Sequence, residues 1–573
     1  MARVETTTIQ KTECIGNSLI TINSNFDNLK NAINTLQTGI ALQDETVQLS
    51  TNIETINFVG AGVNTIIENG IANINIPGNE PLKVARLEEQ GINSGGGKNN
   101  FFILNDGSMR VCGFNANGSL GTGLGDVRVY TPKIPAFNPP LEVDESIAKL
   151  QTQGDCTYAI TTKGRLYGAG YNAQGQLGQG NTVAFYTVFS FIDVTGNGYT
   201  AAPNDPITHI STGTGFQFTF TTIFALTKSG NLYAWGYNNL SQAGISQRQT
   251  GNTITVPRPV SNLGIRGRLV TSGGNRNATT TFVVDSDDKL YVVGRNADGQ
   301  AGINDNTGPE INISNFTLVQ GLPSGYRVNN IRVGGTANNI TTFVILKDGT
   351  LWAAGRNTNG VVFGNATTSP ANQISFTRVS GFTDADYVVD VVAHIDANSV
   401  TCWALIRDGD FYRLKSWGND SFGQMGVDSV ATTRGVVSSI NWPWIRSGAK
   451  VKQIVVAGAG TAKTTLVLDT NNYLWAAGYG GTGLLGNGTL TVTNNTFRRV
   501  LFNPALGTPV EIRSTNNDFG RPPPGRGYIA NFLVLLNTGK VLGWGYDNVS
   551  SGQLGVDAFP EITTIPSIVQ IKN

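Results

Sequence analysis

The chain has 573 residues, a net charge of +1 and only 14% charged residues. This balance provides no basic field for phosphate groups, which argues against nucleic-acid binding. No apolar run reaches the roughly 18 residues of a membrane span, and no apolar signal segment follows the first residues. The sequence therefore predicts neither membrane insertion nor secretion.

The apolar pattern within residues 1–48 predicts that this segment self-associates. Apolar side chains recur there at alternating spacings of three and four residues, which is a coiled-coil heptad seam. Because about three heptads form a short seam, association needs help from flanking structure. The alternative is a lone amphipathic helix that packs on another domain. The seam residues are Leu19, Ile22, Phe26, Leu29, Ile33, Leu36 and Ile40.

Residues 49–79 predict a small β module, and residues 80–97 a linker. Ile56 to Gly78 alternates apolar and polar residues around Asn69-Gly70, the pair typical of a two-residue hairpin turn. Pro81 and the glycines at 95–97 interrupt any regular pattern after it.

Residues 98–573 repeat one phrase eight times, at intervals of about 62 residues. Each unit has two strand-like runs joined by a short turn, then a glycine, an asparagine-rich turn and a proline-containing edge strand. About four strands per repeat is a propeller blade, so we expect an all-β propeller of eight blades, with seven as the alternative. The leading glycines are Gly113, Gly170, Gly236, Gly294, Gly355, Gly418, Gly478 and Gly545.

The sequence near the end of the chain indicates how the propeller ring closes. Residues 565–571 (IPSIVQI) form an apolar strand candidate after the last turn phrase. We expect this strand to pair beside early propeller residues such as Leu82 to Leu87, because an open ring would expose a sheet edge.

The repeated phrase, of the form GxLYAWGxNxxGQLG, resembles the repeat of the regulator of chromosome condensation family. The likeness covers roughly residues 95–573. It implies a β-propeller and an interaction protein, for example an exchange factor or an inhibitor. The family typically closes with seven blades, and its His-Thr pair is replaced here by Cys156-Thr157 and Thr222-Ile223.

The first 80 residues resemble the opening of structural and fibre proteins of tailed phages, particularly those of marine cyanobacteria. That resemblance implies a virion protein assembled in the host cytoplasm, a homotrimer that docks to other virion proteins through its N-terminus. The leading hypothesis from the sequence is therefore a tail fibre or appendage whose propeller contacts a host-surface glycan or protein. A cellular interaction module is the alternative, and a glycan depolymerase is a third hypothesis.

The sequence predicts no catalytic, cofactor or metal site, and hence no enzyme. Nucleophile elbows, zinc spacings and phosphate loops are missing. The two histidines, His209 and His394, lie about three repeats apart. The four cysteines show no CxxC spacing and suit a buried, reduced role; they are Cys14, Cys112, Cys156 and Cys402.

Two loops that break the repeat are candidate recognition sites. In residues 519–526, three prolines hold an extended segment between two arginines, and we single out Arg521, Pro523 and Arg526. Trp442 and Trp444 lie in a stretch between blades, and tryptophan is a favoured contact residue. The alternatives are a stiff connector for the first loop and core anchoring for the tryptophans.

Overall fold

The computed structural model describes four short strands before residue 83 and most of residues 83–569. Within that span it leaves out residues 89–98, 116, 124–127, 154, 197, 199–204, 213–220, 239–241, 246–252, 261–263, 275–278, 306–311, 337–338, 396–398, 439–440, 491–492, 517–529, 547–553 and 555–561. The chain divides into two compact units, Met1–Lys83 and Val84–Asn573.

The described part of the larger unit forms eight antiparallel blades of four strands, each blade pairing in chain order from inner to outer strand. The eight predicted blades are thus confirmed, and seven are excluded. Blade 1 comprises β5 (Val84–Glu88), β6 (Asn99–Leu104), β7 (Met109–Phe114) and β8 (Arg128–Lys133); blade 2 comprises β10 (Ile147–Gln153), β11 (Cys156–Thr161), β12 (Leu166–Tyr171) and β13 (Phe185–Ile192), with β9 (Phe137–Asn138) beside β13; blade 3 comprises β14 (Ile207–Thr212), β15 (Thr222–Thr227), β16 (Leu232–Tyr237) and β17 (Thr253–Pro259); blade 4 comprises β18 (Gly267–Gly273), β19 (Thr280–Asp285), β20 (Leu290–Arg295) and β21 (Asn312–Leu318).

The second half of the ring repeats this order. Blade 5 comprises β22 (Val328–Thr336), β23 (Asn339–Leu346), β24 (Leu351–Arg356) and β25 (Asn372–Arg378); blade 6 comprises β26 (Val388–Ile395), β27 (Val400–Asp408), β28 (Phe411–Asp420) and β29 (Ala431–Val437); blade 7 comprises β30 (Val451–Ala459), β31 (Ala462–Asp469), β32 (Leu474–Gly478) and β33 (Asn494–Arg499); blade 8 comprises β34 (Pro509–Asn516), β35 (Ala530–Leu536), β36 (Val541–Tyr546) and β37 (Ile562–Ile568). The described helical turns are short: η2 (Thr358–Gly360), α2 (Pro443–Arg446) and η3 (Pro504–Leu506).

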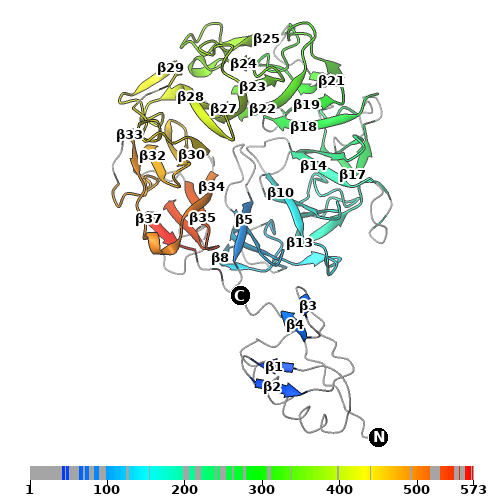
Figure 1. Cartoon of the computed structure of the whole chain (residues 1–573). Helices are drawn as coiled ribbons and strands as arrows, with labels where there is room; N and C mark the ends of the chain where they lie inside the picture. Colours follow the sequence, from blue (N-terminus) through cyan, green and yellow to red (C-terminus); the bar gives the residue numbers. More distant parts are fainter. Residues whose placement is uncertain are drawn as a thin grey trace. The chain divides into compact units, whose positions relative to one another are not determined.

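The innermost strands of the blades surround the centre of the ring (Figure 1). We call these eight strands, β5, β10, β14, β18, β22, β26, β30 and β34, the inner ring. Each carries a bulge at its second residue, where its pairing with the next strand shifts. A bulge re-aims the side chains that follow it, so this recurring bulge places equivalent residues of the eight strands at equivalent positions.

The last glycine of each turn phrase lets the blade contact its neighbour. Gly302, at the end of the phrase in blade 4, has a φ of +63°, and a Cβ there would lie 2.3 Å from the Phe376 ring of blade 5. The same close approach to an aromatic ring of the next blade recurs at Gly121, Gly244, Gly426 and Gly486. Only glycine combines this backbone conformation with this contact.

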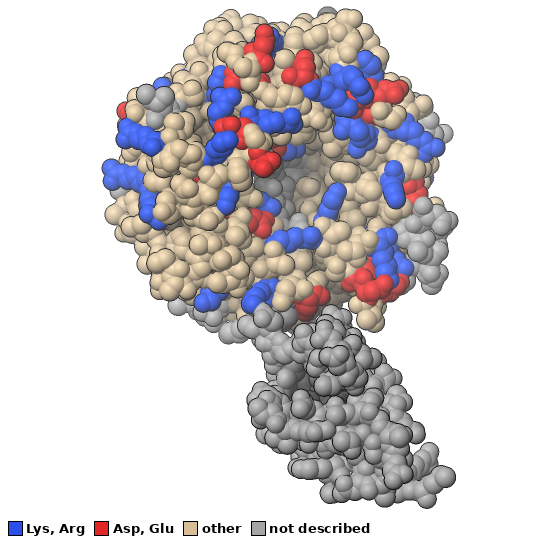
Figure 2. Space-filling model, in the orientation of Figure 1, with Lys and Arg blue, Asp and Glu red and all other residues tan. Residues whose placement is uncertain are grey.

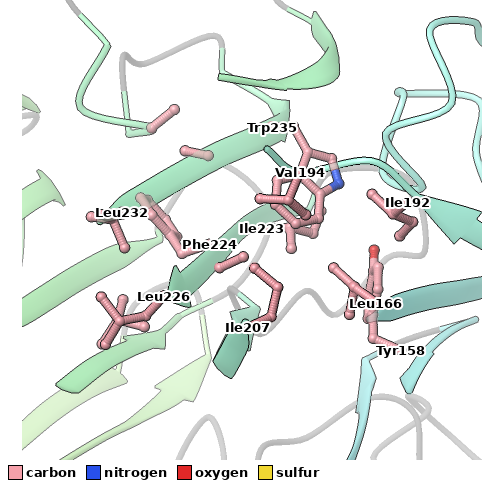
Figure 3. Close-up of a cluster of buried hydrophobic side chains, with 14 of the residues drawn as sticks. Tyr158, Leu166, Ile192, Val194, Ile207, Ile223, Phe224, Leu226, Leu232 and Trp235 are labelled. Atoms are coloured by element: carbon pink, nitrogen blue, oxygen red, sulfur yellow. The ribbon is translucent and has the colours of Figure 1, made fainter. Parts of the chain in front are cut away.

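Tryptophans of the third strands add a polar link to the same interfaces. The indole Nε1 of Trp235 in blade 3 donates to the Gln176 carbonyl of blade 2 at 2.6 Å. Around it, buried side chains from both blades form one apolar cluster, in which Tyr158 and Leu166 face Ile223 and the indole (Figure 3). Trp417 and Trp544 make equivalent bonds to Val361 and Leu484. The hydrophobic core is therefore shared between neighbouring blades.

In five blades, an asparagine two residues after the leading glycine closes the turn. Its Oδ1 accepts the backbone N–H five residues later, and this bond recurs at Asn115, Asn172, Asn238, Asn296 and Asn357. Blade 6 has Asp420 in this place, which accepts from Met425 N at 2.9 Å. The Asp420 carboxylate is fully buried, and its Oδ2 lies 3.1 Å from Arg434 Nε. That pair lacks hydrogen-bond geometry, and burial raises the pKa of Asp420 to about 6.

The ring closes by contact between blades 8 and 1. Val84 N donates to Gly539 O at 3.2 Å, and Leu87 N donates to Glu511 Oε2 at 3.1 Å. The predicted closure through residues 565–571 is wrong, because the last strand, β37, is the outer strand of blade 8 and pairs with β36. Each blade is built from one continuous repeat, so no strand is exchanged at the seam.

The smaller unit confirms one sequence prediction and leaves another outside the described residues. β3 (Asn64–Glu68) pairs antiparallel with β4 (Ile71–Asn75), so two residues, Asn69 and Gly70, join the strands of the predicted hairpin. The seam from Leu19 to Ile40 lies outside the described residues. Part of the predicted 1–48 segment is instead β1 (Leu42–Asp44), which pairs with β2 (Val47–Ser50).

The predicted linker, residues 80–97, requires a correction. It contains β5, the inner strand of blade 1, in which Val84 and Leu87 are buried. This strand is five residues long and mixes charged with apolar residues, so its sequence alone does not separate it from a linker. Its burial against blade 8 makes it a strand.

Substitution of Gly302 should measure the contact between blades. We expect Gly302→Ala to lower the free energy of unfolding by about 3 kcal/mol, about 1 from the left-handed backbone and about 2 from overlap with the Phe376 ring. Gly264 is the matched control, because its φ is +64° but no atom lies within 4 Å of the added Cβ. We expect Gly264→Ala to cost only about 1 kcal/mol in denaturant unfolding. Equal losses in the two variants would show that the ring contact contributes nothing.

Replacing Asp420 by asparagine should change how stability depends on pH. The folded-state pKa of Asp420, about 6, lies above its ordinary value of 3.8, so its protonation stabilises the fold below about pH 4, and this stabilisation is lost as the pH rises through 6. Asp420→Asn keeps the acceptor for Met425 without the charge. The free energy of unfolding of the variant relative to the wild type should rise by about 2.5 kcal/mol between pH 4 and pH 7.5, as measured by urea unfolding at both values. A constant difference would contradict the proposed cost of the buried charge.

Candidate functional site

Basic side chains outnumber acidic ones on the inner strands of the propeller. The inner ring holds six basic residues and three acidic ones, out of 40 and 39 in the whole chain. The inner ring is therefore net +3, whereas the rest of the chain is net −2. Lys and Arg side chains surround the central hollow of one face in Figure 2. The basic residues are Arg86, Lys149, Arg268, Arg332, Lys452 and Arg513, and the acidic ones are Glu88, Asp390 and Glu511.

In the first half of the ring, the cations bind backbone carbonyls of the next blade. Arg86 Nη2 donates to Ile147 O and to Ala148 O, the second bond being 3.0 Å long. Lys149 Nζ donates to Thr208 O at 2.8 Å, and Arg268 Nη2 donates to Val328 O at 2.8 Å. Neutral carbonyls hold Arg86 and Lys149 in place, whereas Arg268 also pairs with the Asp288 carboxylate at 3.0 Å.

In the second half of the ring, acids accompany the cations. Arg332 Nη2 lies 2.6 Å from Asp390 Oδ2, and Arg513 Nη2 lies 2.7 Å from Glu511 Oε1. Lys452 Nζ donates to Asn472 Oδ1 at 2.5 Å. Burial raises the pKa of Glu511, although Arg513 and the bond from Leu87 N oppose that shift.

A second basic cluster lies where blades 4 and 5 meet. The Asp288 carboxylate is almost completely buried and contacts three cations: Arg268 at 3.0 Å, Arg327 at 2.7 Å and Lys347 at 2.6 Å. Burial alone would raise the pKa of Asp288, but hydrogen bonds from Lys347 and Arg327 and the charge of Arg268 outweigh it and lower the pKa. Because one carboxylate serves three cations, two positive charges remain, and their side chains are 40 to 61% exposed.

Among the candidate recognition residues, the two tryptophans follow the alternative of core anchoring. Trp442 and Trp444 are buried, at 0 and 2% exposure, and pack in a cluster with Trp403 and Phe497 through tilted and edge-on ring contacts. Trp442 Nε1 also donates to Met425 O at 3.0 Å. As the helical turn α2 folds these rings inward, the tryptophans anchor the core and are unavailable to a partner. Arg521, Pro523 and Arg526 lie outside the described residues.

The described residues contain no group of three or more His, Cys, Asp or Glu that could hold a metal ion. Cys112, Cys156 and Cys402 are buried free thiols, and burial raises the pKa of Cys156 to about 12. Burial, helped by the charge of Lys149, lowers the pKa of His209. Among the described helices none is long and apolar enough to cross a membrane.

Sequence reasoning missed the inner ring. Its cations come from six of the eight repeats and stand at positions without a fixed residue type, so neither a motif nor the net charge indicates them. The one available signal was the short inner strand before each hairpin, in which a basic residue recurs in six of the eight described blades.

Comparison with known proteins supports the repeat type. No protein-family model matches the chain. Human E3 ubiquitin-protein ligase HERC2 is 28% identical over 262 residues, which are 45% of this chain and 5% of HERC2. The mouse X-linked retinitis pigmentosa GTPase regulator is 27% identical over 169 residues, 29% of this chain and 15% of that protein. The mitochondrial RCC1 domain-containing protein RUG3 of Arabidopsis thaliana is 23% identical over 383 residues, 63% of this chain and 76% of RUG3.

These likenesses correct the localisation expected from the sequence. The similar proteins come from human, mouse and a plant and are cellular, so the predicted virion localisation is wrong. The resemblance of the first 80 residues to phage fibre proteins has no support among them, and neither has the homotrimer. The matched segments span only 5% of HERC2 and 15% of the GTPase regulator. What the comparisons support is an all-β propeller of RCC1-like repeats, RCC1 being the regulator of chromosome condensation.

Proposed function

We propose that this protein is a non-catalytic protein-interaction module whose propeller binds a partner protein. The observation that carries this proposal is the inner ring, which gathers a net +3 on a chain that is otherwise net −2. Its cations are held in place by the neighbouring blades, so they are organised before a partner arrives. Preorganised side chains lose less entropy on binding than mobile ones.

The surrounding scaffold suits binding better than chemistry. Each blade shares its core with its neighbours, as at the Trp235 cluster, so the ring is a rigid platform. At the junction of blades 4 and 5, Asp288 contacts Arg268 of the inner ring and two further cations, Arg327 and Lys347. Charged groups arranged in this way guide association and select partners.

The likeness to RCC1-like proteins supports the same class of function. A more specific form of the proposal is that the partner is a GTPase, since one similar protein is named a GTPase regulator. In that form the propeller would act as an exchange factor or as an inhibitor.

An interaction assay tests the general proposal. When the purified full chain is immobilised, it should bind one partner protein saturably. The same chain added in solution should compete with the immobilised chain for that partner. Direct titration of the purified partner should give a Kd of about 10 µM or tighter. A matched enzymatic assay on envelope polysaccharide should release no reducing ends. Turnover of polysaccharide together with failure to retain any protein would overturn the proposal in favour of a depolymerase.

A nucleotide-release assay tests the specific form. If the retained protein is a GTPase, the full chain should change the release rate of a fluorescent GDP analogue from it by at least about tenfold, faster for an exchange factor and slower for an inhibitor. An unchanged rate, or a partner that binds no nucleotide, would reject the GTPase form and leave the interaction module standing.

A further inference from the structure

The six cations of the inner ring occupy a narrow band along the axis of the propeller. Counted from the bulge at the second residue of each strand, Arg268 and Lys452 stand at the bulge itself. Arg86 and Lys149 follow one position later, and Arg332 and Arg513 three positions later. At about 3.3 Å per strand residue, the band is about 10 Å deep. Residues from six blades thus form one belt, which we call the basic belt.

The basic belt keeps binding capacity despite its bonds to the neighbouring blades. Lys149 is exposed and donates to one carbonyl, and an ammonium group has three donors. The Arg268 and Arg332 side chains are 40 and 38% exposed. The inner strands of blades 1 to 4 carry only one acid, Glu88, but Arg268 also pairs with Asp288 of blade 4. An anionic ligand would therefore find its strongest attraction at Arg86 and Lys149 of blades 1 and 2.

The residue types of the inner ring favour carboxylates over nucleic acid as the anion. Single-stranded nucleic acids bind through aromatic platforms on which bases stack, in addition to cations. The eight inner strands contain no Phe, Tyr or Trp. Their non-charged residues are small or aliphatic, together with Thr, Ser, Asn, Gln, one proline and the two histidines, His209 and His394. Arginine forks pair with carboxylates through two parallel hydrogen bonds and need no stacking partner.

We infer that the basic belt binds an Asp- and Glu-rich polypeptide segment of the partner protein. The segment would enter the central hollow and place its carboxylates on the belt, with Lys149 and Lys452 as charge contacts from opposite halves of the ring. This inference rests on the proposed function and names the chemistry of the partner's contact segment. The spread of the cations over six blades lets an extended acidic segment bind in more than one register.

Charge reversal at the two lysines tests the belt. Each makes one described hydrogen bond to a neutral group, Lys149 to Thr208 O and Lys452 to Asn472 Oδ1, so the fold depends little on them. The probe is a fluorescein-labelled decamer of glutamate, titrated with the full chain by anisotropy at low salt. We expect saturable binding, weakened at least tenfold in the double variant Lys149→Glu, Lys452→Glu and weakened likewise by rising salt.

The matched control is the double variant Arg128→Glu, Lys133→Glu, which makes the same change of charge on β8, the outer strand of blade 1. Both residues are exposed. We expect this variant to bind the decamer within about twofold of the wild type. If the inner variant melts early, Lys149→Gln with Lys452→Gln replaces it, with an expected loss of about threefold.

Three outcomes would overturn the inference. They are failure of the wild type to bind the decamer, equal weakening by the inner and outer variants, and tighter binding of a single-stranded thymidine decamer that the inner variant abolishes. The last outcome would identify a nucleic-acid surface. Failure of the proposed function can be distinguished from failure of the belt inference. In the first case the basic belt would bind the glutamate peptide, but the chain would bind no partner protein. Conversely, if the chain binds a partner protein but not the peptide, the belt inference is wrong and the interaction-module proposal still holds.

Discussion

Contact between neighbouring blades is the constraint on which the rest of this structure depends. No blade buries its own core, because each is a twisted sheet of four short strands with two apolar faces. The turn phrase of one blade must therefore approach the next closely enough for Gly302 to touch the Phe376 ring and for the Trp235 indole to reach Gln176 O. A side chain at Gly302 would disturb the packing between blades 4 and 5, and loss of the Trp235 indole would disturb the packing between blades 2 and 3.

The same constraint determines where the charges stand. As the blade faces are occupied by apolar packing, charged side chains of the inner strands remain at the edge that lines the centre, where they bind carbonyls of the following blade. Arg86, Lys149 and Arg268 each make such a bond. One set of residues thus joins neighbouring blades and carries the positive potential of the central hollow, which couples the stability of the ring to its binding surface.

In blade 6, the repeat has an aspartate where five other blades have an asparagine, and burial of its charge is unfavourable. Asp420 keeps the turn bond that asparagine makes elsewhere, as at Asn296. Its buried charge is accompanied by the ion pair with Arg434 and by the bond from Met425 N. A position that is structural in five blades is therefore titratable in this one, with a pKa of about 6.

The sequence by itself determined the repeat, the eight blades and the hairpin at Asn69-Gly70, because turn glycines and strand alternation are local signals. Only the tertiary structure decided the rest. It placed Trp442 and Trp444 in the core, since a short helical turn folds them inward. It kept the last strand in blade 8, and it made a strand of residues 84–88 through contact with that blade. It also collected six scattered cations into one belt, because net charge adds residues without regard to position, whereas a closed ring brings the same strand of each repeat to a common axis.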